Sequence, residues 1–298
     1  MRELLIILLL ILASCTDNSR VLPPSTGSSS EVLFVVEDLV WSTELEKLAS
    51  DIFSKPIEGV SKKESSNKII QVNHNQFNRI LKTHKNIIII QEKNEERSIK
   101  DKWARNQIVI QLNTQIEKEV FLEKLKKAKS ILDINEIKAI KKQALTRSKK
   151  TSEEHIKRVF QVDVIVPEEY TVVEESDLLF WASYNPEKIE QIKHVFVFSF
   201  KPNANNIKNQ VISKTDSVFS KYLLGAKENM YVQIEPRFPI VFENSFYKGL
   251  WRLENGFMGG PFLIKPYFFD DKIVVSAGII FAPKEKKRNH LKNLEAIL

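Results

Sequence analysis

The sequence has little of three residue types on which many enzymes depend. It contains one cysteine, eight glycines and five histidines among 298 residues. A single cysteine excludes an intrachain disulfide and a multi-cysteine metal cluster, and scarce glycine leaves little material for phosphate-binding loops. The histidines lie far apart along the chain, so no metal-ligand spacing is present. We therefore predict no metal site and no cofactor.

Recognisable catalytic motifs are also missing. There is no Gly-x-Ser-x-Gly elbow, no His-Glu-x-x-His helix, no P-loop and no dinucleotide fingerprint. These absences favour a non-enzymatic protein without excluding an enzyme, because active sites assemble in space. A composition of 43% hydrophobic and 28% charged residues is typical of a globular chain, and it excludes disordered, collagen-like and polytopic membrane proteins.

The N-terminus carries the strongest signal in the sequence. Residues 4–12 form an unbroken apolar run, which is too short to span a bilayer and has the length of a signal-peptide core. The run ends in Leu12, Ala13, Ser14 and Cys15, a sequence that resembles the lipobox of bacterial lipoproteins. The resemblance implies cleavage before Cys15, a diacylglyceryl group on its sulfur and an acyl group on its new amino terminus.

The resemblance gives the first two segments of the chain. Residues 1–14 would be a removed signal peptide, and residues 15–30 a lipidated cysteine with a flexible Ser- and Pro-containing tether. Several acyl chains hold a protein firmly in one leaflet, so the predicted partner of Cys15 is the lipid bilayer. Because Thr16 follows the cysteine where inner-membrane retention needs aspartate, analogy favours the outer membrane, facing the periplasm. The alternative is an ordinary secretory peptide with a chance or buried thiol at Cys15.

The body divides into an N-terminal part, residues 31–160, and a C-terminal part, residues 161–298. In the first, apolar and β-branched runs predict strands at 32–36, 68–72, 87–90 and 107–112. Helices are expected from Ser42 or Thr43 to Phe53 and, in a short form, around 77–81. This alternation predicts an α/β layer with a largely covered sheet.

Residues 114–160 have a helical period of apolar residues, and they carry much of the positive charge. We expect a break at Asp133 and a further helix beginning at Ser152. Residues 117–158 hold 13 Lys or Arg against 7 Asp or Glu, in a chain of net charge +7. A second basic cluster contains Lys284, Lys286, Lys287 and Arg288. The export signal argues against nucleic acid, which leaves anionic lipid, acidic envelope polymers or, as the pattern favours, an ordinary solvated helix face.

In the C-terminal part, the spacing of apolar residues changes from a helical period to one typical of strands. We predict strands at 162–166, 170–173, 178–181, 195–200, 230–234, 239–242, 249–253, 262–264 and 273–281. Only residues 206–223 and 285–298 are predicted to be helical. The sequence thus predicts an α+β fold, with a mainly antiparallel C-terminal sheet and helices packed on one side of it.

The densest unusual stretch is residues 249–262. Trp251 and Arg252 are residue types common at interfaces, and Gly259 and Gly260 permit close backbone approach, so a binding groove is possible here. The ordinary alternative is a strand, a glycine turn and a second strand with a core tryptophan.

Two histidines precede apolar strands. His84 could act as a ligand or as an acid or base at a strand edge, although such a residue more often satisfies a loop hydrogen bond. The same alternatives apply to His194.

Several short motifs together resemble one family. They are Leu81–Ile89, Phe180–Ser183, Asp216–Val218, Gly249–Arg252, Met258–Phe262, Ala282–Pro283, Lys286–Asn289 and Leu294–Ala296. Their order and spacing are similar to those of an uncharacterised lipoprotein family of the Bacteroidota, known only as a domain of unknown function (DUF4837). The resemblance implies an envelope lipoprotein of two α/β-type parts, and no activity or catalytic residue. Asn255-Gly256 stands where the family pattern has Gly-Asp, which removes a carboxylate from the glycine loop.

Three functions are compatible with these observations. The first is a membrane-tethered periplasmic module that binds another envelope protein or polymer. The alternative is a hydrolase-like enzyme acting on envelope polymers, which requires His84 and Arg252 to converge in one pocket. The third is a structural protein whose basic helices lie against anionic lipid.

Overall fold

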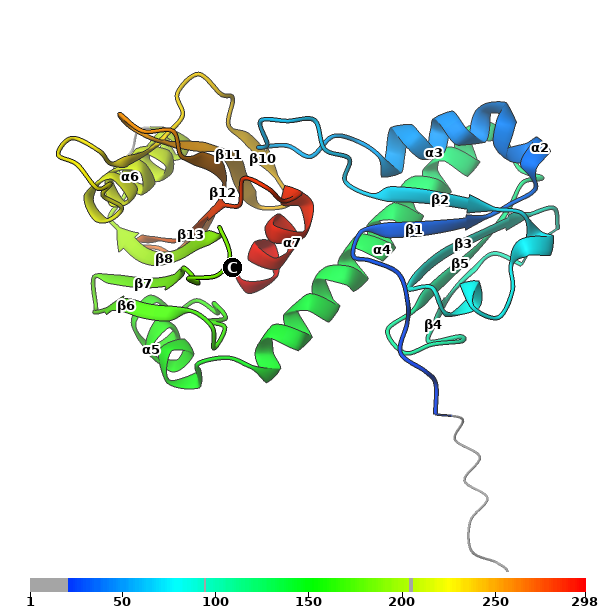
Figure 1. Ribbon diagram of the computed structural model, residues 1–298, viewed down its shortest axis with the longest axis horizontal. Coiled ribbons are helices and arrows are strands. Elements are labelled where there is room, and N and C mark those ends of the chain that lie inside the picture. The colour runs from blue at the N-terminus through cyan, green and yellow to red at the C-terminus, as the bar shows by residue number, and fades with distance from the viewer. Residues whose placement is uncertain (1–20, 94, 204–205) are drawn as a thin grey trace, which may run out of the picture.

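The computed structural model describes residues 21–93, 95–203 and 206–298 (Figure 1). Two β-sheets lie side by side, each with its own helices, and one long helix runs between them. The fold is α+β, as the sequence predicts. No helix in the described part of the chain is long and apolar enough to cross a membrane.

A five-stranded sheet forms the N-terminal part. Its order is β2-β1-β3-β5-β4, where the first four strands run parallel and β4 runs antiparallel to β5. The strands are β1 (Glu31–Val35), β2 (Lys68–Val72), β3 (Asn86–Gln91), β4 (Arg97–Lys100) and β5 (Ile108–Asn113). Ile87 and Ile89 face one side of the sheet, and Ile88 and Ile90 face the other. Because both sides are covered, these strands need no polar alternation, and four of the five were predicted.

The first helical segment begins earlier than predicted. It consists of α2 (Asp38–Val40), a π-helical turn (Trp41–Leu45) and α3 (Glu46–Phe53). The predicted cap at Ser42 or Thr43 is wrong, because both residues lie inside the segment. Their hydroxyls donate to the carbonyl oxygens of Leu39 and Val40, which lie one turn back. Each hydroxyl thus bonds to the preceding turn, and neither residue stands at the helix N-terminus to cap it.

The short helix expected at 77–81 is also wrong. Two 3-10 turns, His74–Gln76 and Leu81–Thr83, stand on either side of it. The carboxamide oxygen of Asn78 accepts from the backbone N–H groups of Ile80 and Leu81. This local side-chain bond competes with α-helical hydrogen bonding and favours a turn.

A single helix, α4 (Lys118–Thr146), runs for 29 residues through the predicted break. The expectation of an end at Asp133 is wrong. Asp133 forms ion pairs with Lys129, four residues earlier, and with Lys292 near the C-terminus. These two cations neutralise a carboxylate that would otherwise destabilise the helix interior. The break in the helix comes instead at residues 147–149.

The segment after α4 differs from the prediction in two places. α5 (Lys150–Phe160) begins before Ser152, whose side chain is buried and donates to Glu175. Residues 162–166 form no strand, although all of them except Asp163 are buried. Their backbone hydrogen bonds go singly to the C-terminal helix and to the residues before α5, for example from Ile165 to the carbonyl of Ile297. This mainly apolar run is therefore buried without joining a β-sheet.

The C-terminal part is built on an eight-stranded antiparallel sheet. Its order is β10-β11-β12-β13-β8-β7-β6, and β9 pairs with β11 beside this path. The strands are β6 (Thr171–Glu175), β7 (Leu179–Tyr184), β8 (Ile192–Phe200), β9 (Val232–Ile234), β10 (Val241–Glu243), β11 (Phe246–Leu253), β12 (Gly259–Phe268) and β13 (Ile273–Phe281). All eight overlap strands predicted from the sequence.

Helices cover both faces of this sheet, and the expectation of one covered face is wrong. On one face, α5 and α7 (Lys287–Ile297) pack through Phe160 and Leu294. On the other, α6 (Ile207–Tyr222) packs through Val211 and Phe219. β13 requires both layers, because every residue from Ile273 to Ile280 is buried.

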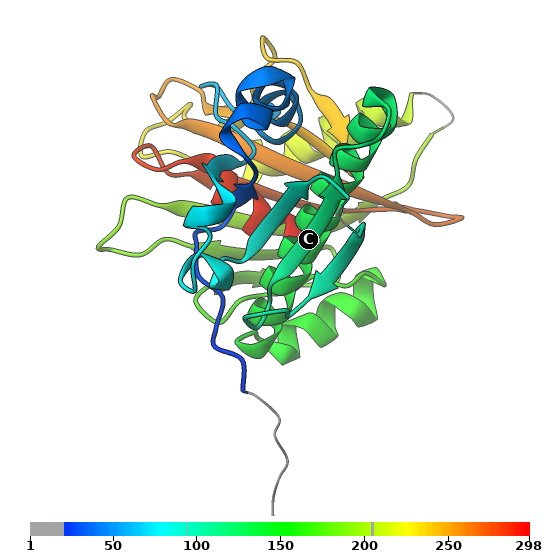
Figure 2. The same cartoon turned by 90° about the vertical axis from the view of Figure 1, so that its right-hand side faces the viewer.

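When the molecule is turned by 90°, the N-terminal part lies in front of the C-terminal sheet (Figure 2), and α4 packs against α7 where the two parts meet. Glu64, in the connection between α3 and β2, accepts from the backbone N–H groups of Lys287 and Arg288 at 2.7 and 3.1 Å. The same carboxylate pairs with the guanidinium of Arg288 at 3.2 Å. A residue of the N-terminal part thus caps the last helix, where the helix dipole favours negative charge.

A second polar junction centres on Glu136 of α4, whose side chain is 3% exposed. One carboxylate oxygen accepts from the backbone N–H of Ser30, at 2.7 Å, just before β1. The other accepts from Lys292 of α7 at 2.6 Å. One buried carboxylate therefore fastens the start of the N-terminal sheet and the last helix of the chain to α4.

Candidate functional site

The ends of β11 and β12 beside the turn that joins them contain four of the predicted site residues. Trp251 lies opposite Gly260, and Arg252 lies opposite Gly259, in the ladder that joins the two strands. The Trp251 indole is buried and donates from Nε1 to the carbonyl oxygen of Ile280 on β13, at 3.1 Å. A side chain on Gly260 would overlap this carbonyl and crowd the indole nitrogen. The glycine is needed because the indole passes so close to the backbone.

Arg252 is not available as a binding group. Its guanidinium forms ion pairs with Glu254 at 2.5 Å and with Glu235 at 3.5 Å. Hydrogen bonds from Arg237, together with the nearby charge of Arg252, hold the pKa of Glu235 at about 2. Two carboxylates therefore already pair with Arg252, which does not reach the pocket described next.

An apolar pocket of about 500 Å³ opens beside this turn. It lies on the face of the sheet that α6 covers, and no charged residue lines it. Its aromatic and methionine walls are Trp181, Tyr222, Trp251, Phe257, Phe281, Met230 and Met258. A concave site of this size with mainly apolar walls is the usual form of a small-molecule site.

Two loops form the rim of the pocket and are tied together. Asn255, at the tip of the β11–β12 turn, has a positive φ of 53°, a conformation that Asn tolerates well. Its side-chain amide donates to the carbonyl oxygen of Asn229, at 2.9 Å, in the loop between α6 and β9. Phe257, in the same turn, is 97% exposed at the rim. Asn255 thus does a structural task, which fits the absence of a carboxylate at this point.

One polar ring interrupts the apolar walls. His194, on β8, lines the pocket and accepts at Nδ1 from the indole Nε1 of Trp181, at 3.1 Å. Trp181 in turn stacks on Phe196, with ring centroids 5.5 Å apart. Burial lowers the pKa of His194 to about 4, so the ring is neutral at ordinary pH.

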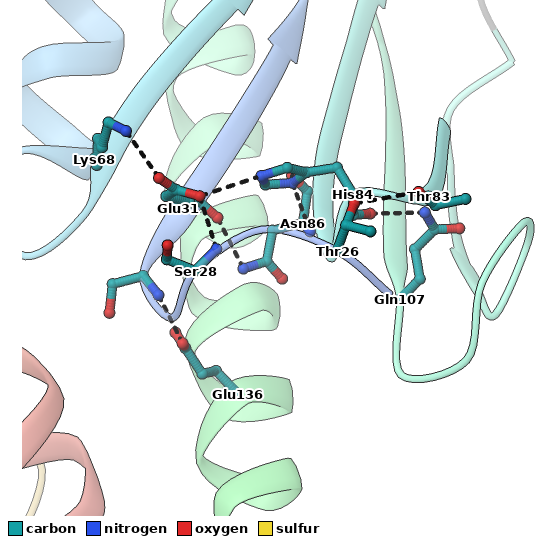
Figure 3. A network of polar contacts seen from close by, with 10 residues as sticks. Thr26, Ser28, Glu31, Lys68, Thr83, His84, Asn86, Gln107 and Glu136 are labelled. Atoms are coloured by element: carbon teal, nitrogen blue, oxygen red, sulfur yellow. Dashed lines mark hydrogen bonds and ion pairs between the residues drawn. The ribbon is translucent and has the colours of Figure 1, made fainter. Parts of the chain in front are cut away.

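His84 lies in the other sheet and takes no part in this pocket. Its Nδ1 bonds the backbone of Asn86 at 3.1 Å, and its Nε2 faces the Glu31 carboxylate at 3.7 Å (Figure 3). Gln107 donates to the carbonyl oxygen of His84 at 2.7 Å. Burial lowers the pKa of His84, and a hydrogen bond from Lys68 is the main cause that holds the pKa of Glu31 at about 2. His84 therefore has the loop-bonding role that was its ordinary alternative.

His84 and Arg252 do not converge. His84 contacts Glu31 on β1 and Asn86 on β3, in the N-terminal sheet. Arg252 pairs with Glu235 and Glu254, which follow β9 and β11 in the C-terminal sheet. The version of the enzyme hypothesis that needs both in one pocket is therefore wrong. Among the described residues, no group of three or more His, Cys, Asp and Glu is placed to hold a metal ion.

The last residues of the predicted tether, from 24 to 30, are part of the folded structure. Pro24 and Thr26 form parallel bridges with Arg105 and His84. Gly27, at a positive φ of 89°, leaves no room for a side chain above the His84 ring. The expectation of a flexible segment through residue 30 is thus wrong from residue 24 on, because this stretch bridges to the residues that precede β3 and β5. Cys15, the predicted lipidation site, lies outside the described residues.

The basic segment is largely paired. Seven of its 13 cations form ion pairs: Lys118 with Glu44, Lys124 with Glu96, Lys126 with Glu123, Lys129 with Asp133, Lys150 with Glu153, Lys157 with Asp163, and Arg158 with Asp177. Most of these pairs are exposed. Each one adds little stability, but together they neutralise much of the face.

The second basic cluster lines a different, polar cavity of about 590 Å³. This cavity lies between the α3–β2 connection, the β11–β12 turn and the start of α7. Its cations are Lys62, Lys63, Lys284, Lys286 and Lys287. Gly259, Gly260 and Trp251 also border it, so the glycine turn separates a basic cavity from the apolar pocket.

Comparison with known families follows the division of the fold. Residues 148–298 match the model of a domain of unknown function, DUF4837, and these 151 residues are more than half of the chain. The chain belongs to the DUF4837 family. Residues 25–148 match a second domain of unknown function, DUF8532. The DUF4837 match therefore contains the whole C-terminal sheet and both of the cavities beside its glycine turn, apart from residues 60–64.

Other comparisons add little to the DUF4837 assignment. No curated protein matches the sequence. One similar solved structure is a crystal structure from Bacteroides thetaiotaomicron VPI-5482 at 1.50 Å resolution, with 11% identity and a TM-score of 0.20. The match covers 44% of this chain and 41% of that chain, so the chain spans about two fifths of the solved chain's length.

Sequence reasoning found one wall of the pocket and missed the others. The glycine stretch identified Trp251, Gly259 and Gly260. Tyr222 and Met230 follow no motif, because they are brought in by the end of α6 and the loop after it. His194 was singled out in the sequence, but nothing there placed it beside Trp181 on the opposite wall of this pocket.

Proposed function

We propose that this protein is a lipid-anchored module of the bacterial cell envelope that binds a small apolar ligand in the pocket beside the β11–β12 turn. The proposal keeps the anchor and the binding role that the sequence predicts, and it moves the recognition site from Arg252 to the apolar walls. The single observation that carries it is the uncharged pocket of about 500 Å³.

The chemistry of the walls supports a binding role. Tryptophan, tyrosine and phenylalanine supply large apolar area at low conformational cost, and methionine adapts to irregular shapes. The walls belong to the core of this face, because Leu223, Val232 and Trp251 lie in the same buried cluster as Phe196 and Phe219. The pocket is therefore a space that this core leaves unfilled. The rim is held by the Asn255–Asn229 contact, so the pocket is preformed.

The anchor would hold this pocket near a membrane. Cys15 lies six residues before Val21, the first described residue, and six extended residues reach at most about 22 Å. The described chain begins beside the N-terminal sheet, and α6 with the pocket lies at the other end of the molecule (Figure 1). The pocket is thereby offered to envelope components away from the attachment point.

Filling the pocket should abolish binding. Met258→Trp adds a large ring at the rim, and we expect affinity for the uncharged fluorescent probe N-phenylnaphthylamine to fall roughly tenfold or more. The measurement is a titration that follows the increase in probe fluorescence. The matched control is Leu178→Trp, which adds the same ring at an exposed position outside the pocket. Equal affinity in the two variants would contradict the proposed site.

Removing the acylated sulfur should release the protein from membranes. In a Gram-negative host, we expect the wild-type chain to sediment with membranes and to incorporate labelled palmitate, and the Cys15→Ser variant to do neither. Ser14→Gly is the control, because it changes the preceding residue but keeps it small. Membrane association of Cys15→Ser that survives high salt would contradict the anchor.

A further inference from the structure

His194 uses only one of its two ring nitrogens within the fold. It lies on β8 opposite Ile279 of β13 and Ser183 of β7, on a face whose other members, apart from Ser183, are apolar. Its ring is only partly buried, and the space beside it is the apolar pocket. A leucine or a phenylalanine here would leave the Trp181 indole N–H without its acceptor, so Nδ1 has a structural role, whereas the second ring nitrogen has none among the described residues.

The hydrogen bond to Trp181 fixes the tautomer of this histidine. An indole nitrogen can only donate, so Nδ1 of His194 must be the acceptor. Because the ring is neutral, its one proton sits on Nε2. The Trp181–His194 pair thus presents an N–H donor on the side of the ring away from the indole.

That donor has no protein partner. Nε2 of His194 is not among the fully buried unpaired atoms, and no group in the described residues lies within hydrogen-bonding distance of it. The Trp251 indole, also at the pocket, already donates to Ile280. The Tyr222 hydroxyl can both donate and accept a hydrogen bond, so it favours neither a donor nor an acceptor on the ligand.

We infer that His194 selects uncharged apolar ligands that carry a carbonyl-type hydrogen-bond acceptor. This inference rests on the proposed function, because it assumes that the pocket takes a ligand, and it adds the chemical class of that ligand. The acceptor follows from the free N–H of His194. The absence of charge follows from the walls, which hold no Lys, Arg, Asp or Glu to pair with a charged end.

A hydrogen-bond acceptor on the ligand should raise its affinity. A ligand without an acceptor displaces the water at the pocket and leaves the Nε2–H of His194 without a partner. A donor that is desolvated and left without an acceptor weakens binding. We therefore expect a preference of about tenfold for a carbonyl compound over a hydrocarbon of the same shape. Acetylnaphthalene and ethylnaphthalene, substituted at the same ring position, form such a pair.

The test is displacement of N-phenylnaphthylamine from the full chain by each of these two compounds. Wild type should bind acetylnaphthalene about tenfold more tightly than ethylnaphthalene. His194→Phe should lose this preference, and His194→Gln, which restores an N–H donor, should regain part of it. Equal affinities in wild type, or a preference that survives in His194→Phe, would overturn the inference and leave the pocket standing.

A second measurement uses only the wild-type protein, so it does not depend on whether a variant folds. In NMR spectra of wild-type protein labelled at histidine, the Nε2–H signal of His194 should move on addition of acetylnaphthalene and much less on addition of ethylnaphthalene. Equal movement with both compounds would overturn the selective role. If neither compound nor the probe binds at all, the proposed function falls together with the inference.

Discussion

Replacing Gly260 by alanine is expected to lower the free energy of unfolding by about 3 kcal/mol. The new Cβ would overlap the carbonyl oxygen of Ile280 and crowd the Trp251 indole nitrogen. Backbone cannot move aside as a flexible side chain can, so the Trp251–Ile280 hydrogen bond would break in a buried environment. Urea unfolding followed by tryptophan fluorescence measures the loss.

The control for this variant is Gly256→Ala in the same turn. There the added Cβ meets the end of the Leu253 side chain, which can shift. We expect a loss of no more than about 1 kcal/mol. If Gly260→Ala proved as stable as Gly256→Ala, the close approach of Trp251 to the backbone would be wrong, and with it one wall of the pocket.

The second large effect is expected at the junction of the two parts. Glu136→Ala should cost about 3–5 kcal/mol, because it removes one partner of a buried ion pair. The backbone N–H of Ser30, which is fully buried, would lose its acceptor, and Lys292 would keep only Asp133 at 3.5 Å. Thermal unfolding monitored by circular dichroism would report the change.

An exposed carboxylate of the same helix provides the comparison. Glu123 pairs with Lys126, but the two side chains are 69% and 53% exposed. Glu123→Ala should therefore change stability by less than about 1 kcal/mol. Similar losses at Glu123 and Glu136 would show that the buried network does not hold the two parts together.

Much of the fold could be predicted because local sequence patterns indicate most of its strands. The run from Ile87 to Ile90 is β-branched throughout, and a strand buried on both faces needs no other signal. The predicted strand at 273–281 is likewise buried on both faces. The division into a mainly parallel and an antiparallel sheet follows from the change of period along the chain.

The errors arose where distant partners override local preference. Asp133 resembles a helix end until Lys292, far away in sequence, neutralises it within α4. Residues 162–166 resemble a strand, but their hydrogen bonds go to Ile297 and to residues before α5. The segment before residue 31 resembles a linker, but Thr26 bridges to His84. None of these partners has a sequence signal that a single chain reveals.

The residues of the candidate site also divide into those that a local sequence signal identifies and those that only a distant partner explains. The turn glycines drew attention to Trp251 because close backbone approach has a local signature. The selecting group, His194, depends on a neighbouring strand that places Trp181 against its Nδ1. Arg252 was chosen for its residue type, and its carboxylate partners Glu235 and Glu254 could not be inferred from spacing alone.

The central claim is that a ligand enters the pocket lined by Trp181 and Trp251. The chain has four tryptophans, and the other two, Trp41 and Trp103, pack on Phe34 and Phe77 in the N-terminal part. The most direct measurement is an NMR titration of the four indole N–H signals with acetylnaphthalene. We predict that the signals of Trp181 and Trp251 shift while those of Trp41 and Trp103 stay in place. Four unmoved signals at saturating ligand, or shifts confined to Trp41 and Trp103, would contradict the account.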